Sequence, residues 1–290
     1  MPTGAERYYH LAANLLRSYR YHSKYQYPFA IICDRKNKLT VEFDDVVILN
    51  QPSNSYNDKL RIFEVTPYNE TIFIDADSLA YGDLNAWWEM FEQMSDFCVF
   101  GYSYYDLSET RGWFCAKGIG EFADRVRFIP TFNGGVYYLR KTDKCAEIFR
   151  LAQHFATHYD SYAFNGFSKP ADEPVLALAM AVYGCEPLCR NELVFAPRPY
   201  QVALDINKGV AKSKLNGQKY RLVHWSNYYT LKSAYRFEVG CLNSAISGWS
   251  WISRLLYKHK VSKAYLWICN IRALVLRVNK KLLKTFKDNS

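Results

Sequence analysis

Short runs of consecutive apolar residues, separated by segments with helical periodicity, extend along most of this chain. The runs lie at residues 29–33, 46–49, 71–74, 97–100, 135–139 and 220–223. Strands that are apolar at every position are typical of a sheet buried on both faces, because a half-exposed strand alternates apolar with polar residues. Helical patterns separate the runs at residues 6–20, 59–66, 84–94, 142–158 and 172–183. This order predicts an α/β fold, with a mainly parallel sheet flanked by helices.

Composition supports a large buried core and excludes several classes of protein. The chain has 290 residues, of which 49% are apolar and 17% aromatic, so low-complexity disorder is excluded. No stretch approaches the roughly 18 uninterrupted apolar residues of a transmembrane helix, and the first residues do not form a signal peptide. The eight cysteines form no Cys-x-x-Cys pair, which indicates reduced, mostly buried thiols. We therefore expect a cytoplasmic protein.

Positive charge is concentrated at the C-terminal end. Residues 241–290 carry a net charge of +9, which equals that of the whole chain, so residues 1–240 are neutral overall. A neutral body argues against nucleic-acid binding. Apolar and aromatic residues recur at helical spacing among the basic ones, a pattern typical of helices on anionic membrane surfaces. We expect one domain over 1–240 and a basic amphipathic helical tail over 241–290, which either binds the cytosolic membrane face peripherally or packs on the body.

Two carboxylates directly follow the apolar run at 71–74. Asp75 and Asp77 are two residues apart, a spacing that places both on one side of an extended chain. Carboxylate oxygens at the end of a strand suit a hard divalent cation, Mg²⁺ or Mn²⁺, which keeps open positions for phosphate oxygens. A pair with this spacing also arises by chance or in an ordinary turn, so the surrounding segments decide its meaning.

Those segments resemble family 8 glycosyltransferases, the group that includes glycogenin and galactinol synthase. The resemblance covers residues 3–232 and rests on segments in the family's order, at 59–60, 66–68, 72–79, 82–84, 132–136, 172–173 and 222–225. It implies a GT-A fold, which is Rossmann-like, and transfer of a sugar from a nucleotide-diphosphate sugar, usually a UDP-sugar. It also implies retention at the anomeric carbon and a glycan, lipid-linked or protein acceptor.

The resemblance also implies roles for individual residues. Asp75, Asp77 and His224 would hold the metal ion, Mn²⁺ or Mg²⁺. Asp172 would face the anomeric centre and Asn133 would approach the sugar, so these two are the candidate catalytic residues. The remaining expected donor contacts are Thr3, Gly4, Tyr8, Lys59, Ala76, Gly134, Gly135, Glu173 and Lys232.

The chain departs from the family pattern at three positions. Almost no strand precedes the turn at Gly4, although the family's nucleotide site begins with one. Glu173 replaces an expected amide, and Lys232 is displaced from the family's lysine position after His224. Outside the family context, the same residue types have ordinary structural explanations: a surface lysine at 59, a turn at 133–135 and a helix cap at 172.

Two other functions stay open at this point. A sugar nucleotidyltransferase would share the sheet architecture, but it needs a Gly-rich, Arg-containing loop after the first strand, which residues 3–6 do not supply. A non-enzymatic, basic membrane-associated adaptor would need a basic face on the body, which the neutral charge of residues 1–240 disfavours.

Overall fold

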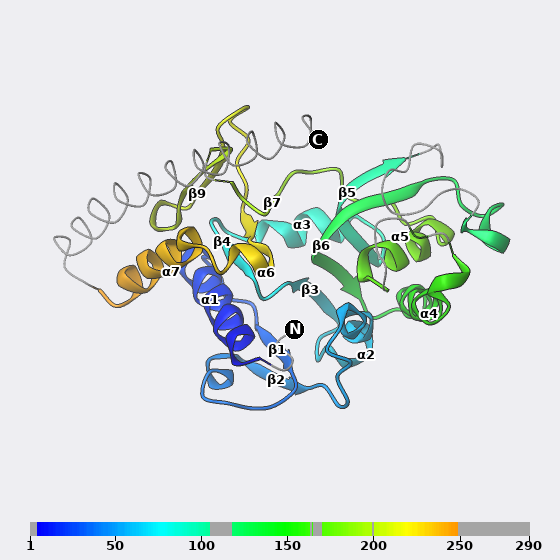
Figure 1. The fold of residues 1–290 in the computed structure, drawn as a ribbon, viewed down its shortest axis with the longest axis horizontal. Helices are drawn as coiled ribbons and strands as arrows, with labels where there is room; N and C mark the ends of the chain where they lie inside the picture. Colours follow the sequence, from blue (N-terminus) through cyan, green and yellow to red (C-terminus); the bar gives the residue numbers. More distant parts are fainter. Residues whose placement is uncertain (1–4, 105–117, 163, 165–169, 199, 249–290) are drawn as a thin grey trace, which may run out of the picture. The chain divides into compact units, whose positions relative to one another are not determined.

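The computed structural model describes residues 5–104, 118–162, 164, 170–198 and 200–248 (Figure 1). The chain divides into two compact units, Met1–Asn227 and Tyr228–Ser290. The helices are α1 (Glu6–His22), α2 (Ile62–Val65), α3 (Ala86–Glu92), α4 (Asp143–Thr157), α5 (Asp172–Val182), α6 (Ser226–Tyr229) and α7 (Ser233–Ile246). Short 3₁₀ helices occur at η1 (Thr40–Glu42), η2 (Tyr56–Arg61), η5 (Gly120–Phe122), η6 (Tyr159–Ser161) and η7 (Ile206–Lys208).

The described residues of the first unit form ten strands. They are β1 (Ala30–Cys33), β2 (Asp45–Ile48), β3 (Glu70–Ile74), β4 (Ser78–Ala80), β5 (Phe97–Tyr104), β6 (Ile129–Arg140), β7 (Leu193–Phe195), β8 (Val202–Asp205), β9 (Val210–Ser213) and β10 (Leu222–His224). Each apolar run of the sequence falls on one of these strands, and each helical pattern falls on a helix. The α/β class is therefore confirmed.

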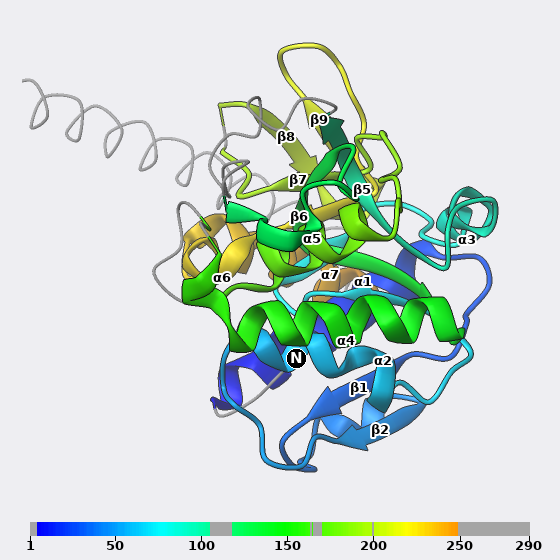
Figure 2. The same cartoon turned by 90° about the vertical axis from the view of Figure 1, so that its right-hand side faces the viewer.

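The strands of the described residues form one parallel, one mixed and two antiparallel sheets, flanked by helices (Figure 2). β1 pairs with β2 in parallel, and β10 lies between β7, to which it is parallel, and β4, to which it is antiparallel. β6 lies between β3 and β5 and is antiparallel to both, and β8 pairs with β9. The pairing is thus more antiparallel than the sequence pattern indicates. A continuous apolar run reports burial on both faces of a strand and carries no information about the direction of its partner.

The largest core lies between β6 and the helices α4 and α5. α5 packs against β6, and α4 packs against α5. Phe149 of α4 is buried. Its ring centroid lies 5.1 Å from that of Phe97 and 5.9 Å from that of Phe63. Tyr137 of β6 is fully buried and stacks on Phe73 of β3, with 5.7 Å between the two ring centroids. This core therefore fixes the positions of β3, β6 and α5.

Local structure differs from the expected helix at 59–66. The chain forms η2 and then the single turn of α2, and Ser55 caps η2 by accepting a hydrogen bond from the backbone N–H of Asn57. Asp58 does not cap a helix here, because its carboxylate accepts hydrogen bonds from the backbone N–H groups of Ser53 and Asn54. Asp58 therefore ties the loop at residues 53–54 to η2, directly ahead of Lys59.

Two further expectations concern the cysteines and the C-terminal tail. The six cysteines among the described residues are free, and all but Cys189 are buried, as the sequence predicts. Within the described ranges, no helix is long and apolar enough to cross a membrane. Most of the basic tail lies outside the described residues, so its amphipathic helices and the domain boundary after residue 240 stay predictions.

Replacing Phe149 by alanine tests the core between β6 and the helices. We expect Phe149→Ala to lower the free energy of unfolding by about 3–5 kcal/mol, because a fully buried aromatic ring leaves a cavity. Leu215→Ala is the control, since that side chain is 95% exposed and should change stability little. Urea unfolding followed by far-UV circular dichroism measures both, and equal stabilities of the two variants would contradict this description of the core.

Candidate active site

The ends of β3 and β10 bring two carboxylates and an imidazole together. β3 ends at Ile74, and β4 begins at Ser78, which lies opposite His224 in the antiparallel pairing of β4 with β10. Nε2 of His224 lies 3.1 Å from Oδ1 of Asp77 and 3.7 Å from Oδ2 of Asp75. The three possible ligand atoms all lie within 4.8 Å of one another. The cluster that the resemblance implies therefore exists in the folded chain.

Asn133 fixes the orientation of the His224 ring. Its Oδ1 lies 2.6 Å from Nδ1 of His224. Because an amide oxygen only accepts hydrogen bonds, Nδ1 donates and Nε2 faces the two carboxylates. An imidazole nitrogen this close to carboxylate oxygens needs a proton or a cation between them. The donor set thus fits a divalent metal ion.

Burial and charge act in opposite directions on His224 and Asp77. Burial lowers the pKa of His224, but the hydrogen bond to Asp77 and the charges of Asp75 and Asp77 outweigh it and raise the pKa. Burial likewise raises the pKa of Asp77, while the hydrogen bond from His224 and its charge hold that pKa below its ordinary value. The cluster therefore favours positive charge at Nε2, which is the position where a metal ion would bind.

Lys59 lies buried behind this cluster. Its Nζ donates to Oδ2 of Asp75 at 2.8 Å, to Oδ2 of Asp172 at 2.9 Å and to the carbonyl oxygen of Gly134 at 3.1 Å. Burial alone lowers the pKa of Lys59, but the charges of Asp172 and Asp75 raise it above its ordinary value. The lysine is therefore a permanent cation that ties η2, β3, β6 and the first turn of α5 together.

Asp172 has a second buried partner, which the sequence analysis missed. The hydroxyl of Tyr137 donates to Oδ2 of Asp172. Burial and the charge of Asp172 raise the pKa of Tyr137 well above its ordinary value, so this hydroxyl stays protonated. Alternation along β6 could have shown that Tyr137 points to the same face as Gly135 and Asn133, but nothing local paired it with Asp172. Tyr137 and Lys59 together hold the carboxylate of Asp172 at the edge of the cleft.

Gly134 and Gly135 both lie within β6, as the apolar run at 135–139 predicts for Gly135, and not in a turn. A Cβ atom at Gly134 would lie 2.6 Å from the Tyr137 hydroxyl and 2.7 Å from Oδ2 of Asp172. One at Gly135 would lie 2.5 Å from Nδ1 of His224. Both glycines are therefore required by close packing against the site.

Glu173 occupies the position where the resemblance implies an amide. Its Oε1 accepts a hydrogen bond from the backbone N–H of Gly134 at 2.6 Å. Burial and the neighbouring charge of Asp172 raise the pKa of Glu173 to about 7, and the hydrogen bond from Gly134 opposes this. Glu173 therefore changes its charge near neutral pH.

A cleft of about 640 Å³ opens over these groups. This volume lies within the usual range for small-ligand sites. The cleft brings together most of the residues expected from the sequence: Tyr8, Lys59, Asp75, Ala76, Asp77, Asn133, Gly134, Asp172, Glu173 and His224. Its walls also include residues that the sequence analysis missed: Asn54, Ser55, Tyr56, Phe195, Ser226 and Asn227. Two of these residues are close in the sequence to expected site residues: Tyr56 lies shortly before Lys59, and Ser226 lies shortly after His224. Their positions in the sequence could have indicated them.

Four expected donor contacts are not among the residues that line the cleft, and one of them, Gly135, packs against His224 and Asn133. Thr3 and Gly4 lie outside the described residues. Lys232 belongs to the second unit, where its Nζ donates to the hydroxyl of Tyr228 at 2.5 Å and lies 3.8 Å from the centroid of that ring. Their roles stay predictions.

Known structures share this arrangement of elements. A crystal structure of the galactosyltransferase LgtC in complex with donor and acceptor sugar analogs matches with a TM-score of 0.53 and 13% identity, over 84% of this chain and 94% of that one. An active-site mutant of LgtC matches with a TM-score of 0.53 and 12% identity over the same shares. The chain has the GT-A glycosyltransferase fold. No protein-family model and no curated protein matches the sequence.

Removing the buried charge of Lys59 tests the network around it. We expect Lys59→Met to lower the free energy of unfolding by about 3–5 kcal/mol, because Asp75 and Asp172 would lose their buried counter-charge. Lys24→Met is the control, since Lys24 is exposed. Urea unfolding in the presence of EDTA measures both variants. A Lys59→Met protein as stable as the control would show that the lysine does not neutralise these carboxylates.

The raised pKa of Glu173 predicts a pH-dependent stability. A folded-state pKa above the unfolded value stabilises the fold at low pH, and this contribution is lost as pH rises through about 7. Glu173→Gln should therefore become more stable than the wild type as pH rises from 5 to 8, by on the order of 2–3 kcal/mol. Thermal unfolding of metal-free protein measures the difference. The exposed Glu121→Gln should track the wild type, and a pH-independent difference for Glu173→Gln would contradict the shift.

Proposed function

We propose that this protein is a metal-dependent glycosyltransferase that moves a sugar from a nucleotide-diphosphate sugar, a UDP-sugar first of all, to an acceptor with retention at the anomeric carbon. The observation that carries the proposal is the cluster of Asp75, Asp77 and His224 at the wall of a cleft large enough for a ligand of that size. The shared fold with a galactosyltransferase solved with donor and acceptor sugar analogs supports the same conclusion.

The cluster supplies a suitable set of ligands for Mn²⁺ or Mg²⁺. Carboxylate oxygens from Asp75 and Asp77 are hard donors, and the imidazole of His224 adds a borderline one. A divalent cation bound there would offset the negative charge that develops on the leaving diphosphate. Asn133 contributes by holding the imidazole in the orientation that leaves Nε2 free for the ion.

The neighbouring residues position the sugar. Asp172 is held by Lys59 and Tyr137 at the cleft, where it can face the anomeric carbon. Gly134 lines the cleft and lets Tyr137 and Asp172 pack against the backbone of β6, because a Cβ atom there would collide with both. Glu173 adjoins Asp172 and can donate a hydrogen bond to a sugar hydroxyl when it is protonated. Lys59 acts by orienting carboxylates, since its three donors are already used.

Each of the two alternative functions, the adaptor and the nucleotidyltransferase, predicts a different set of residues at the site. A membrane-associated adaptor needs no cluster of metal ligands, and a nucleotidyltransferase needs an arginine-containing loop ahead of α1. The acceptor class, whether glycan, lipid-linked or protein, stays open. Attachment of residues 241–290 to anionic membranes remains part of the proposal as a prediction from the charge of the sequence.

A donor screen by thermal shift tests the proposal. We expect one nucleotide-diphosphate sugar to raise the melting temperature only when Mn²⁺ or Mg²⁺ is present, by the equivalent of about 2.7 kcal/mol at a hundred times its Kd. Asp77→Asn should lose this response, whereas Asp160→Asn, at an exposed position outside the cleft, should keep it. A response that persists in EDTA or in Asp77→Asn would overturn metal-dependent donor binding. A flat response from folded protein across the panel would favour the adaptor.

A further inference from the structure

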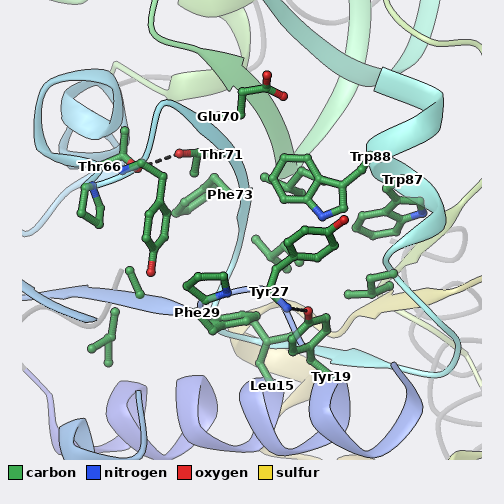
Figure 3. A pocket seen from close by; sticks show the side chains of 18 of the residues that line it. Leu15, Tyr19, Tyr27, Phe29, Thr66, Glu70, Thr71, Phe73, Trp87 and Trp88 are labelled. Carbon is green, nitrogen blue, oxygen red and sulfur yellow. Dashed lines mark hydrogen bonds between the residues drawn. The ribbon is translucent and has the colours of Figure 1, made fainter. Parts of the chain in front are cut away.

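Outside the candidate active site, the described residues enclose a cavity of about 570 Å³ between β1 and β3 (Figure 3). Its wall is mostly apolar, with Leu15, Phe29 and Trp87 among the side chains that point into it. None of the described residues that line it is a histidine or a cysteine, so it offers none of the ligands that borderline metal ions prefer. A pair of exposed imidazoles lies instead at the end of α4.

His154 and His158 lie side by side at the C-terminal end of α4. His154 is in the last turn of the helix, and His158 is the residue directly after it. Residues four apart on a helix lie on the same face. The two rings are exposed, and their centroids are 4.3 Å apart with 37° between the ring planes. Because Zn–N bonds are about 2.0–2.1 Å long, two imidazoles can share one ion only when they lie side by side in this way.

The backbone of α4 fixes the tautomer of His158. The carbonyl oxygen of His154 lies 3.0 Å from the backbone nitrogen of His158 and 3.0 Å from Nδ1 of its ring. A carbonyl oxygen only accepts hydrogen bonds, so Nδ1 donates, and the lone pair of the neutral ring is on Nε2. Metal-bound histidines commonly donate their other ring N–H to a backbone carbonyl. His158 is therefore held in the tautomer that a metal ligand needs.

The end of α4 also favours a cation electrostatically. The last carbonyl groups of a helix carry partial negative charge, and α4 is a helix of 15 residues. The chain has no lysine or arginine between residues 151 and 162, and the exposed Asp160 adds a negative charge. Arg150, one turn before His154, forms an ion pair with Glu147. An ion beside the two rings would thus lie in a favourable local field.

We propose that His154 and His158 form a metal site separate from the candidate active site, which binds a borderline transition-metal ion, Zn²⁺ first of all, through two imidazole nitrogens. Imidazole suits Zn²⁺, whereas the carboxylates of the cleft suit Mg²⁺ or Mn²⁺, so the two sites select different ions. This inference rests on α4 alone and does not depend on the proposed function.

Two protein ligands leave the rest of the coordination to water. Among the described residues, the only three possible ligands that lie close together are Asp75, Asp77 and His224 of the cleft. The site on α4 is therefore open, and it binds more weakly than a closed, four-ligand zinc site. An ion shared by the two rings would hold the last turn of α4 in helical form, over the buried ring of Phe155.

Zinc titration of the full chain by calorimetry at pH 7.5 tests the proposal. We expect a binding event with a Kd of roughly 1–100 µM, since half the ligands of a structural zinc site are present. His154→Ala and His158→Ala should each weaken it by about tenfold or more. His10→Ala is the matched control, because it removes an exposed histidine of α1 and should leave the event unchanged. Zinc bound at the cleft or at a cysteine remains in all three variants, so this loss is specific to the pair.

Amide hydrogen exchange then locates the ion. Zinc should slow exchange in residues 154–158 of the wild type roughly tenfold and should leave these amides unchanged in His158→Ala. Both alanine variants should fold like the wild type, since both side chains are exposed, and far-UV circular dichroism checks this. Unchanged zinc affinity in both variants, or zinc-dependent protection elsewhere with none at the end of α4, would overturn the proposal.

Discussion

The buried ammonium of Lys59 is the interaction on which the site depends. It lies between Asp75 and Asp172, which are carried by different elements, and it also binds the backbone of β6 at Gly134. Asp75 and Asp172 share this one hydrogen-bond partner, and two buried carboxylates so arranged would repel one another if the partner were not a cation. The lysine therefore sets the spacing between the end of β3 and the start of α5, and thereby the width of the cleft.

A second balance of charge holds the candidate metal ligands in place. His224 is drawn to Asp77 by a hydrogen bond and is oriented by Asn133 on its other side. The same carboxylates that raise the pKa of the imidazole in the absence of metal would bind a divalent ion in its place. The cluster is thus organised before any ion binds, because Asp75 and Asp77 lie between the paired strands β3 and β4, and His224 and its partner Asn133 lie on the paired strands β10 and β6.

The sequence by itself indicated most of the helices and strands, and with the family resemblance it indicated the candidate metal ligands Asp75, Asp77 and His224. Apolar runs predicted the strands because burial on both faces leaves a local pattern, and Asp75 and Asp77 were visible because they follow a strand directly. Tertiary structure alone decided the direction of the pairing, the burial of Lys59 and the contact of Tyr137 with Asp172. These depend on partners far apart in the chain, such as Lys59 and Asp172, which are separated by 113 residues. A local pattern records how deeply a residue is buried, but only the folded chain determines which residue lies against it.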